Sequence, residues 1–64
     1  MVKAQYISVW DGGVTIATDC LFDVEANEVY DIESVDVDGL DICEREYVLL
    51  PDGTEIECQG GEVL

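Results

Sequence analysis

The segment from Val14 to Phe22 constrains the fold more than any other part of this chain. An alternation of period two is typical of a β-strand with one buried face. Here it places these residues on one side of the strand: Val14, Ile16, Thr18, Cys20 and Phe22. The turn signal Asp11-Gly12-Gly13 lies directly before the segment, and glycine supplies the positive φ of a tight hairpin turn. With the preceding run Ala4–Trp10, the pattern predicts an antiparallel hairpin.

Short runs of β-branched and aromatic residues continue beyond this hairpin. They predict three further strands, at residues 29–37, 45–50 and 54–58. Asn27 can adopt the left-handed conformation that closes a hairpin loop, and Pro51-Asp52-Gly53 suits a β-turn.

The sequence also predicts the structure of two segments that lie outside these strands. A short helical turn is expected near residues 38–44, because Asp38 would cap it well. Residues 59–64 are expected to form a frayed tail. The chain has no internal repeat or linker, so residues 1–64 are expected to form a single acidic domain.

The predicted fold class is all-β, with α+β as the alternative. We expect a single small antiparallel sheet of about five strands, partly closed or accompanied by the helical turn near residues 38–44. A chain of 64 residues buries only about 60% of the surface that its unfolded form exposes. One small core is therefore the most that this chain can build.

The charge of the chain is strongly unbalanced. Sixteen residues are Asp or Glu, only Lys3 and Arg45 oppose them, and the net charge is -14. Acidic disordered tails have few apolar residues, whereas 48% of this chain is hydrophobic, which indicates a folded domain. The acidity disfavours direct binding to nucleic acid and to anionic membranes, because both are polyanions. Apolar runs are short, so no transmembrane span or signal peptide is expected, and the expected location is the cytoplasm.

The sequence offers few groups for catalysis or for metal binding. It contains no His, and neither Ser8 nor Ser34 has an evident base beside it, so we do not expect an enzyme. The three cysteines, Cys20, Cys43 and Cys58, have no C-x-x-C spacing. They are interpreted as reduced, small buried hydrophobes. No cofactor, no metal site and no small-molecule ligand is expected.

The acids recur in pairs two residues apart. On a strand, residues i and i+2 share a face at a separation of about 6.6 Å, so such pairs could form rows of carboxylates that imitate the phosphates of DNA. The candidate partner-binding residues of this acidic face are Asp31, Glu33, Asp36, Asp38, Glu44, Glu46, Glu55 and Glu57. Alternation of apolar and polar residues on any half-exposed strand explains the spacing equally well, but a solvent face normally mixes both charges.

Two other interpretations stay open. Proteins of high-salt habitats also carry large acidic surpluses, so the chain could be a halophile-adapted domain of unknown activity. The run Asp36-Val37-Asp38-Gly39-Leu40-Asp41 resembles part of a calcium loop, which suggests a calcium-binding module. Aligning Gly39 with the glycine of an EF-hand places Ser34 first and Arg45 twelfth, however, where acidic ligands are needed.

Three segments carry a resemblance to a known class of proteins. They are Tyr6-Ile7-Ser8-Val9-Trp10-Asp11-Gly12-Gly13, Cys43-Glu44-Arg45-Glu46-Tyr47 and Leu50-Pro51-Asp52-Gly53-Thr54. They resemble segments of short acidic proteins carried by phages and other bacterial mobile elements. In size and charge the chain is similar to anti-CRISPR proteins, including small acidic inhibitors that resemble DNA. This resemblance implies an inhibitor that occupies the Lys/Arg-lined surface of a CRISPR surveillance complex.

The sequence therefore predicts a non-enzymatic, nucleic-acid-mimicking inhibitor that acts as a monomer or dimer. The expected partner is a basic DNA-binding protein or complex, such as a CRISPR effector, a restriction enzyme or a repair enzyme. Such binding should be fast and weakened by salt, because charge steers the encounter and salt screens it.

Overall fold

The alternating segment forms one arm of the central hairpin, as expected. In the computed structural model, which describes residues 1–64, strand β1 (Val2–Trp10) pairs antiparallel with β2 (Thr15–Asp23). The connecting 3-10 turn η1 (Asp11–Gly13) places Gly12 at φ 77° and Gly13 at φ 80°, so the predicted positive φ is confirmed. Residues that carry a Cβ rarely adopt these backbone angles, which explains why glycine occupies both positions.

Four shorter strands complete a single antiparallel sheet of six strands. They are β3 (Glu28–Tyr30), β4 (Cys43–Leu49), β5 (Glu55–Gln59) and β6 (Glu62–Val63). The strand order is β3-β2-β1-β4-β5-β6, which leaves β3 and β6 at the two edges. The all-β prediction is thus confirmed, and the structure contains no α-helix. It therefore has no helix of the length and apolarity that a membrane crossing requires.

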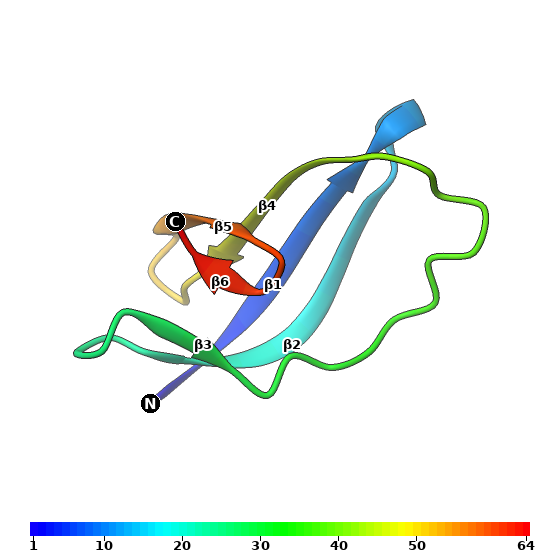
Figure 1. Ribbon diagram of the computed structural model, residues 1–64. Helices are drawn as coiled ribbons and strands as arrows, with labels where there is room; N and C mark the ends of the chain where they lie inside the picture. The colour runs from blue at the N-terminus through cyan, green and yellow to red at the C-terminus, as the bar shows by residue number, and fades with distance from the viewer.

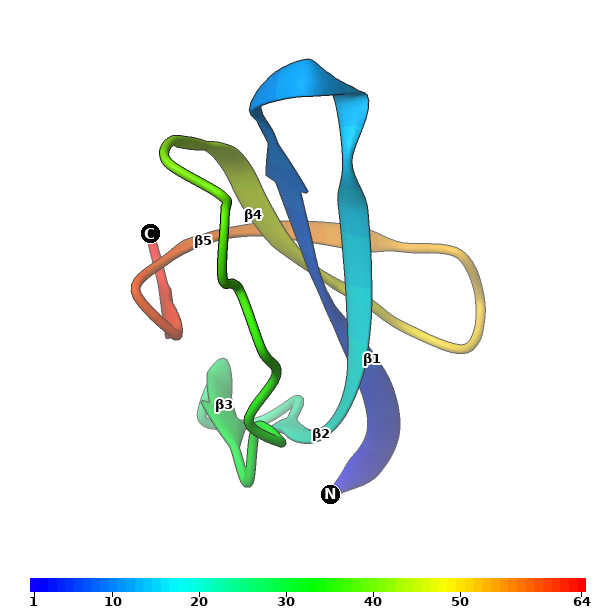
Figure 2. The same cartoon turned by 90° about the vertical axis from the view of Figure 1, so that its right-hand side faces the viewer.

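The sheet curls until its two edges approach, so that it nearly forms a barrel (Figures 1 and 2). No ladder of hydrogen bonds joins β3 to β6. The approach is close at Gly61, where an added Cβ would lie 3.3 Å from Ile32 Cδ1. Gly61 also has φ +84°, so both its backbone and its surroundings favour glycine.

The inner face of the curled sheet holds the core. Its buried cluster is Ala4, Tyr6, Cys20, Phe22, Val48 and Cys58. Phe22 and Val48 are 1% and 0% exposed, and they come from β2 and β4 on either side of β1. Cys20 and Cys58 are free thiols that pack as apolar residues, as expected, and burial raises the pKa of both.

The predicted loop and turn chemistry is confirmed at two further positions. Asn27, in the loop between β2 and β3, has φ 56°. Gly53 has φ 92°, and its N–H donates to Leu50 C=O at 2.9 Å, which closes a turn with Pro51 at its second position.

Three boundary predictions are wrong. The strand expected at residues 29–37 ends at Tyr30. The helical turn expected near residues 38–44 is absent, and a hydrogen bond from Leu40 N–H to Val37 C=O closes a non-helical turn there. The tail expected to fray forms β6, whose Val63 pairs with Cys58, because the Gly60-Gly61 turn folds the chain back along β5. The sheet therefore has six strands in place of about five.

Candidate acidic interface

Residues 31–42, here called the strap, connect β3 to β4 without regular secondary structure. In Figure 1 the strap bows away from the sheet and returns at the far end of the central hairpin. It carries these acids and no Lys or Arg: Asp31, Glu33, Asp36, Asp38 and Asp41. It also exposes Val35, Val37 and Ile42, which are 41%, 37% and 63% accessible. Acidic and apolar groups are thus presented together.

Local chemistry explains why the strap leaves the sheet. Asp31 has φ 53°, a left-handed conformation that ends the extended run immediately after Tyr30. Further along, Asp36 Oδ1 accepts the N–H of Asp38 at 3.0 Å, and Gly39 has φ 83°. An Asp side chain bonded to a backbone N–H two residues later mimics a turn, so this stretch bends instead of extending.

The strap gathers half of the acids predicted to bind a partner. Asp31, Glu33, Asp36 and Asp38 all lie on it and are exposed. Glu44 follows two residues beyond the strap, in β4, and is also exposed. These five residues are exposed and lie within one continuous segment, residues 31–44, although only Glu44 belongs to a strand.

Glu46 has a different role, because it points into the barrel. Its Oε1 accepts the Tyr6 hydroxyl at 2.7 Å, and its Oε2 accepts the N–H of Gly60 at 3.3 Å. Gly61 N–H donates to the same Tyr6 hydroxyl at 3.0 Å. Burial is the main reason why the pKa of Tyr6 lies far above its ordinary value, and the hydrogen bond to Glu46 raises this pKa further. The hydroxyl therefore stays protonated and donates. This group, here called the clamp, ties the β5–β6 turn to β1 and β4.

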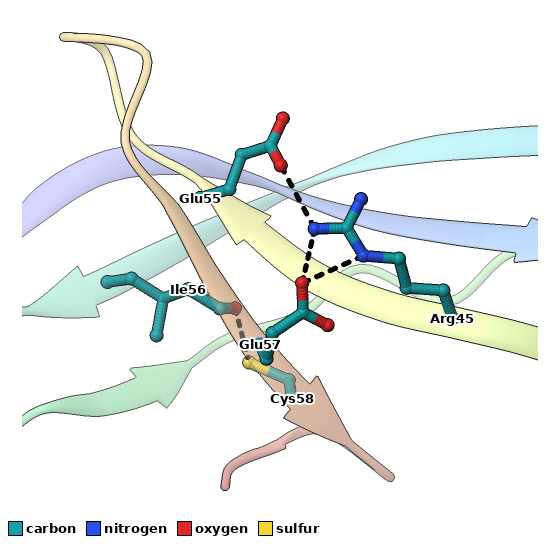
Figure 3. A network of polar contacts seen from close by, with 5 residues as sticks. All are labelled: Arg45, Glu55, Ile56, Glu57 and Cys58. Atoms are coloured by element: carbon teal, nitrogen blue, oxygen red, sulfur yellow. Dashed lines mark hydrogen bonds and ion pairs between the residues drawn. The ribbon is translucent and has the colours of Figure 1, made fainter.

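Glu55 and Glu57 lie on the outer face of β5, where they bind Arg45 (Figure 3). Arg45 Nη2 lies 3.0 Å from Glu55 Oε1, and Arg45 Nε donates to Glu57 Oε1 at 2.8 Å. The guanidinium also stacks on the ring of Tyr47, 4.1 Å from its centroid. Hydrogen bonding to Arg45 lowers the pKa of Glu57. Both carboxylates are therefore engaged within the chain, and the single positive charge of Arg45 offsets one of their two negative charges.

The eight predicted residues consequently do not form one acidic face. Glu46 shares the inner face with Tyr6 and Val48, whereas Glu57 lies opposite Tyr47 on the outer face. The row of carboxylates expected at residues 31–38 requires a long third strand, and β3 ends at Tyr30, before these acids begin. The exposed acids without an internal cation are concentrated on the strap and at Glu44.

Several other acids hold turns or side chains in place. Asp23 Oδ1 accepts the N–H groups of Glu25 and Ala26, at 3.1 and 3.2 Å. Asp52 Oδ1 accepts Thr54 N–H at 2.9 Å, and this bond lowers the pKa of Asp52. The Tyr30 hydroxyl donates to Glu28. These acids stabilise local structure, so the total charge overstates the number of carboxylates available to a partner.

One strap acid, Asp41, is missed by the sequence prediction because no other acid lies two residues away from it. The signal that identifies it is the absence of Lys and Arg from the whole stretch between Lys3 and Arg45.

The structure brings together no group of three or more Cys, Asp or Glu side chains that could hold a metal ion. Cys43 is partly exposed at the start of β4, and desolvation raises the pKa of its thiol.

Comparison with known proteins adds no identification. No protein-family model, no curated protein and no solved structure matches this chain.

Proposed function

We propose that this protein is a nucleic-acid-mimicking inhibitor, and that the strap with Glu44 is the surface that occupies the basic DNA-binding site of its target. The target is a CRISPR surveillance complex or another DNA-processing enzyme. The observation that carries the proposal is the separation of charge. Arg45 is engaged with β5, and the strap has no Lys or Arg of its own. Lys3 borders the same hollow as Asp31 and Glu33 but forms no ion pair with them.

The exposed acids of the strap are well suited to bind a basic protein surface. Their side chains are held by no Lys or Arg, so a basic partner does not have to break an internal ion pair to reach them. A surface of one sign attracts an oppositely charged groove over long range and accelerates the encounter. Such an inhibitor needs no catalytic group, which fits a chain without His.

A competition assay tests the proposal directly. A type I CRISPR surveillance complex, a restriction endonuclease and a repair glycosylase are each incubated with labelled DNA and increasing amounts of this protein. We expect DNA release from at least one of them, and less release as salt is raised. If every enzyme in the panel retains its DNA, the proposal is wrong.

Two charge-matched variants localise the surface. The strap variant combines Glu33→Gln, Asp38→Asn and Asp41→Asn, and the control variant combines Glu25→Gln, Glu28→Gln and Glu62→Gln. Each change removes one negative charge, so both variants have net charge -14 + 3 = -11. We expect the strap variant to need about tenfold more protein for the same inhibition, with little change in the control. Equal losses would assign the effect to bulk charge.

Adaptation to high salt is a second candidate, because exposed acids also occur away from the strap, for example Glu25 and Glu62. A dispersed acidic surface is what a high-salt solvent would select. A thermal melt in low and in molar salt separates the two candidates. A fold that needs molar salt supports adaptation, whereas a fold that is stable in dilute buffer leaves the charge to serve a partner.

A further inference from the structure

The central hairpin leaves part of one strand without a neighbour. β3 pairs with β2 only from Leu21 to Asp23, but β2 extends back to Thr15. Residues 15–18 therefore have β1 on one side and no strand on the other. Figure 1 shows the strap diverging from β2 along this stretch, and Figure 2 shows the same segment running from the end of β3 to the start of β4.

The hydrogen bonds of β2 show which of its backbone N–H and C=O groups point away from β1 at this edge. Trp10 N–H donates to Val14 C=O at 2.7 Å, so the even-numbered residues of β2 bond to β1. Asp19 C=O instead accepts Glu33 N–H from the strap at 3.0 Å, so the odd-numbered residues point away from β1. The N–H and C=O groups of Thr15 and Ala17 consequently face outward, and no backbone group of the chain bonds to them.

The strap is attached only at its two ends. At one end, Glu33 binds Asp19, and Thr18 Oγ1 donates to Glu33 C=O at 2.9 Å. At the other end, Asp11 N–H donates to Ile42 C=O at 3.0 Å. The hydrogen bonds between these ends are local to the strap. The open edge of β2 therefore lies beside an acidic segment that does not pair with it.

We propose that the edge of β2 from Thr15 to Ala17 binds an extended, lysine- or arginine-bearing segment of a partner protein by strand addition. Unpaired N–H and C=O groups on a strand edge are the groups that an added strand uses. Cationic side chains on that strand would meet Asp19 at one end of the edge and the strap acid Glu33, whose N–H bonds to Asp19 C=O. The site requires a basic polypeptide and goes beyond the proposed competition with DNA.

A second copy of this chain is a poorer occupant of the same edge. It carries net charge -14, so pairing two copies would place like charges opposite each other. Charge on or beside an edge strand is a common way in which proteins prevent self-pairing. Dimerisation through β2 is nevertheless a distinct outcome in the experiment below.

A peptide titration tests the site. The probe is a short labelled peptide of alternating lysine and valine, and the control has the same sequence with an N-methyl group on every backbone nitrogen. Both peptides have the same charge and side chains, but only the first can extend the sheet. We expect the methylated peptide to bind about tenfold more weakly, because it loses the N–H groups that would donate to the C=O groups of Thr15 and Ala17.

Amide hydrogen exchange locates the binding. In the free protein, the amides of Thr15 and Ala17 should exchange rapidly, and the unmethylated peptide should protect them while leaving the outward amide of Val63, at the other sheet edge, unchanged. As a second check, Ala17→Pro removes an outward N–H and should weaken binding of the unmethylated peptide, with folding verified by a thermal melt.

Several results would overturn the proposal. These are equal binding of the two peptides, no binding of either, protection of Thr15 and Ala17 in the free protein by the strap, or protection through dimerisation. If the peptide fails but DNA is still displaced from a nuclease, the strand-addition site is wrong and the proposed inhibitor function stands. If the peptide binds but no enzyme in the panel releases DNA, the reverse holds.

Discussion

The clamp and the strap use the same kind of side chain in opposite ways. In the clamp, both oxygens of Glu46 accept hydrogen bonds, from the Tyr6 hydroxyl and from Gly60 N–H. On the strap, Asp38 and Asp41 are exposed and bind no cation of the chain. The comparison shows that a net charge of -14 contains two populations of acids. One stabilises the fold, and the other is available to a partner.

The two regions should also differ in stability. The clamp closes the β5–β6 end of the sheet over a core that contains Phe22 and Val48. The strap is held by backbone bonds at its ends and exposes its valines. A segment with few buried contacts and few hydrogen bonds opens more easily than a core strand. Substitutions should therefore act on stability in the barrel and on binding in the strap.

The largest difference should appear when one apolar side chain is truncated in the core and another on the strap. Phe22→Ala should lower the free energy of unfolding by about 3–5 kcal/mol, because it removes a ring that is 1% exposed and leaves a cavity. Val37→Ala on the strap should change it by no more than about 0.5 kcal/mol. Urea denaturation followed by the fluorescence of Trp10 measures both. Similar losses would mean that the strap is an integral part of the core.

A smaller effect should separate two acids of the same strand. Glu46→Ala should cost about 1–3 kcal/mol, since it leaves the Tyr6 hydroxyl and the N–H of Gly60 without their acceptor. Glu44→Ala removes the same charge from an exposed position and serves as the matched control. Thermal melts compare the two, and hydrogen exchange at Leu64, whose N–H donates to Glu57 C=O at 3.1 Å, reports whether β6 has loosened. If both variants melt alike, the clamp does not hold the turn.

The smallest effect should appear at Arg45 and should depend on pH. The folded-state pKa of Glu57 lies below its unfolded value, so the Arg45 pair contributes stability above the unfolded pKa of about 4.3 and loses it as pH falls through the folded pKa. Arg45→Gln should therefore lower the melting temperature slightly at neutral pH, and the difference from the original protein should shrink in acid. High salt should reduce the difference as well. A difference that stays constant with pH would indicate that stacking on Tyr47, and not charge, is what matters.

The strands that the sequence predicts well are those with strong local patterns. Alternation from Ile16 to Phe22 and the glycines of η1 identify the hairpin, because side-chain period and positive φ act within a few residues. The strand expected at residues 29–37 also alternates, but it ends at Tyr30. There the left-handed Asp31 and the turn at Asp36–Asp38 override the pattern. Alternation alone does not distinguish a paired strand from an exposed, extended segment.

The candidate site shows the same limit. Sequence spacing grouped Glu44 with Glu46 and Glu55 with Glu57, and it assigned all of them to one surface. The register of the sheet instead directs Glu46 inward and Glu57 outward, where Arg45 reaches it across the β4–β5 pair. Arg45 binds acids of the next strand and neither of its sequence neighbours, Glu44 and Glu46. Partners that lie in another strand cannot be inferred from spacing within one strand.

The sequence by itself determined that this chain folds as a small antiparallel sheet and that it carries a large excess of negative charge. Both properties follow from local periodicity, turn residues and composition. Only the tertiary structure decided which carboxylates are internal, which are paired and which remain exposed on the strap. It also decided that β2 keeps an open edge, because strand pairing depends on contacts between residues far apart in the chain.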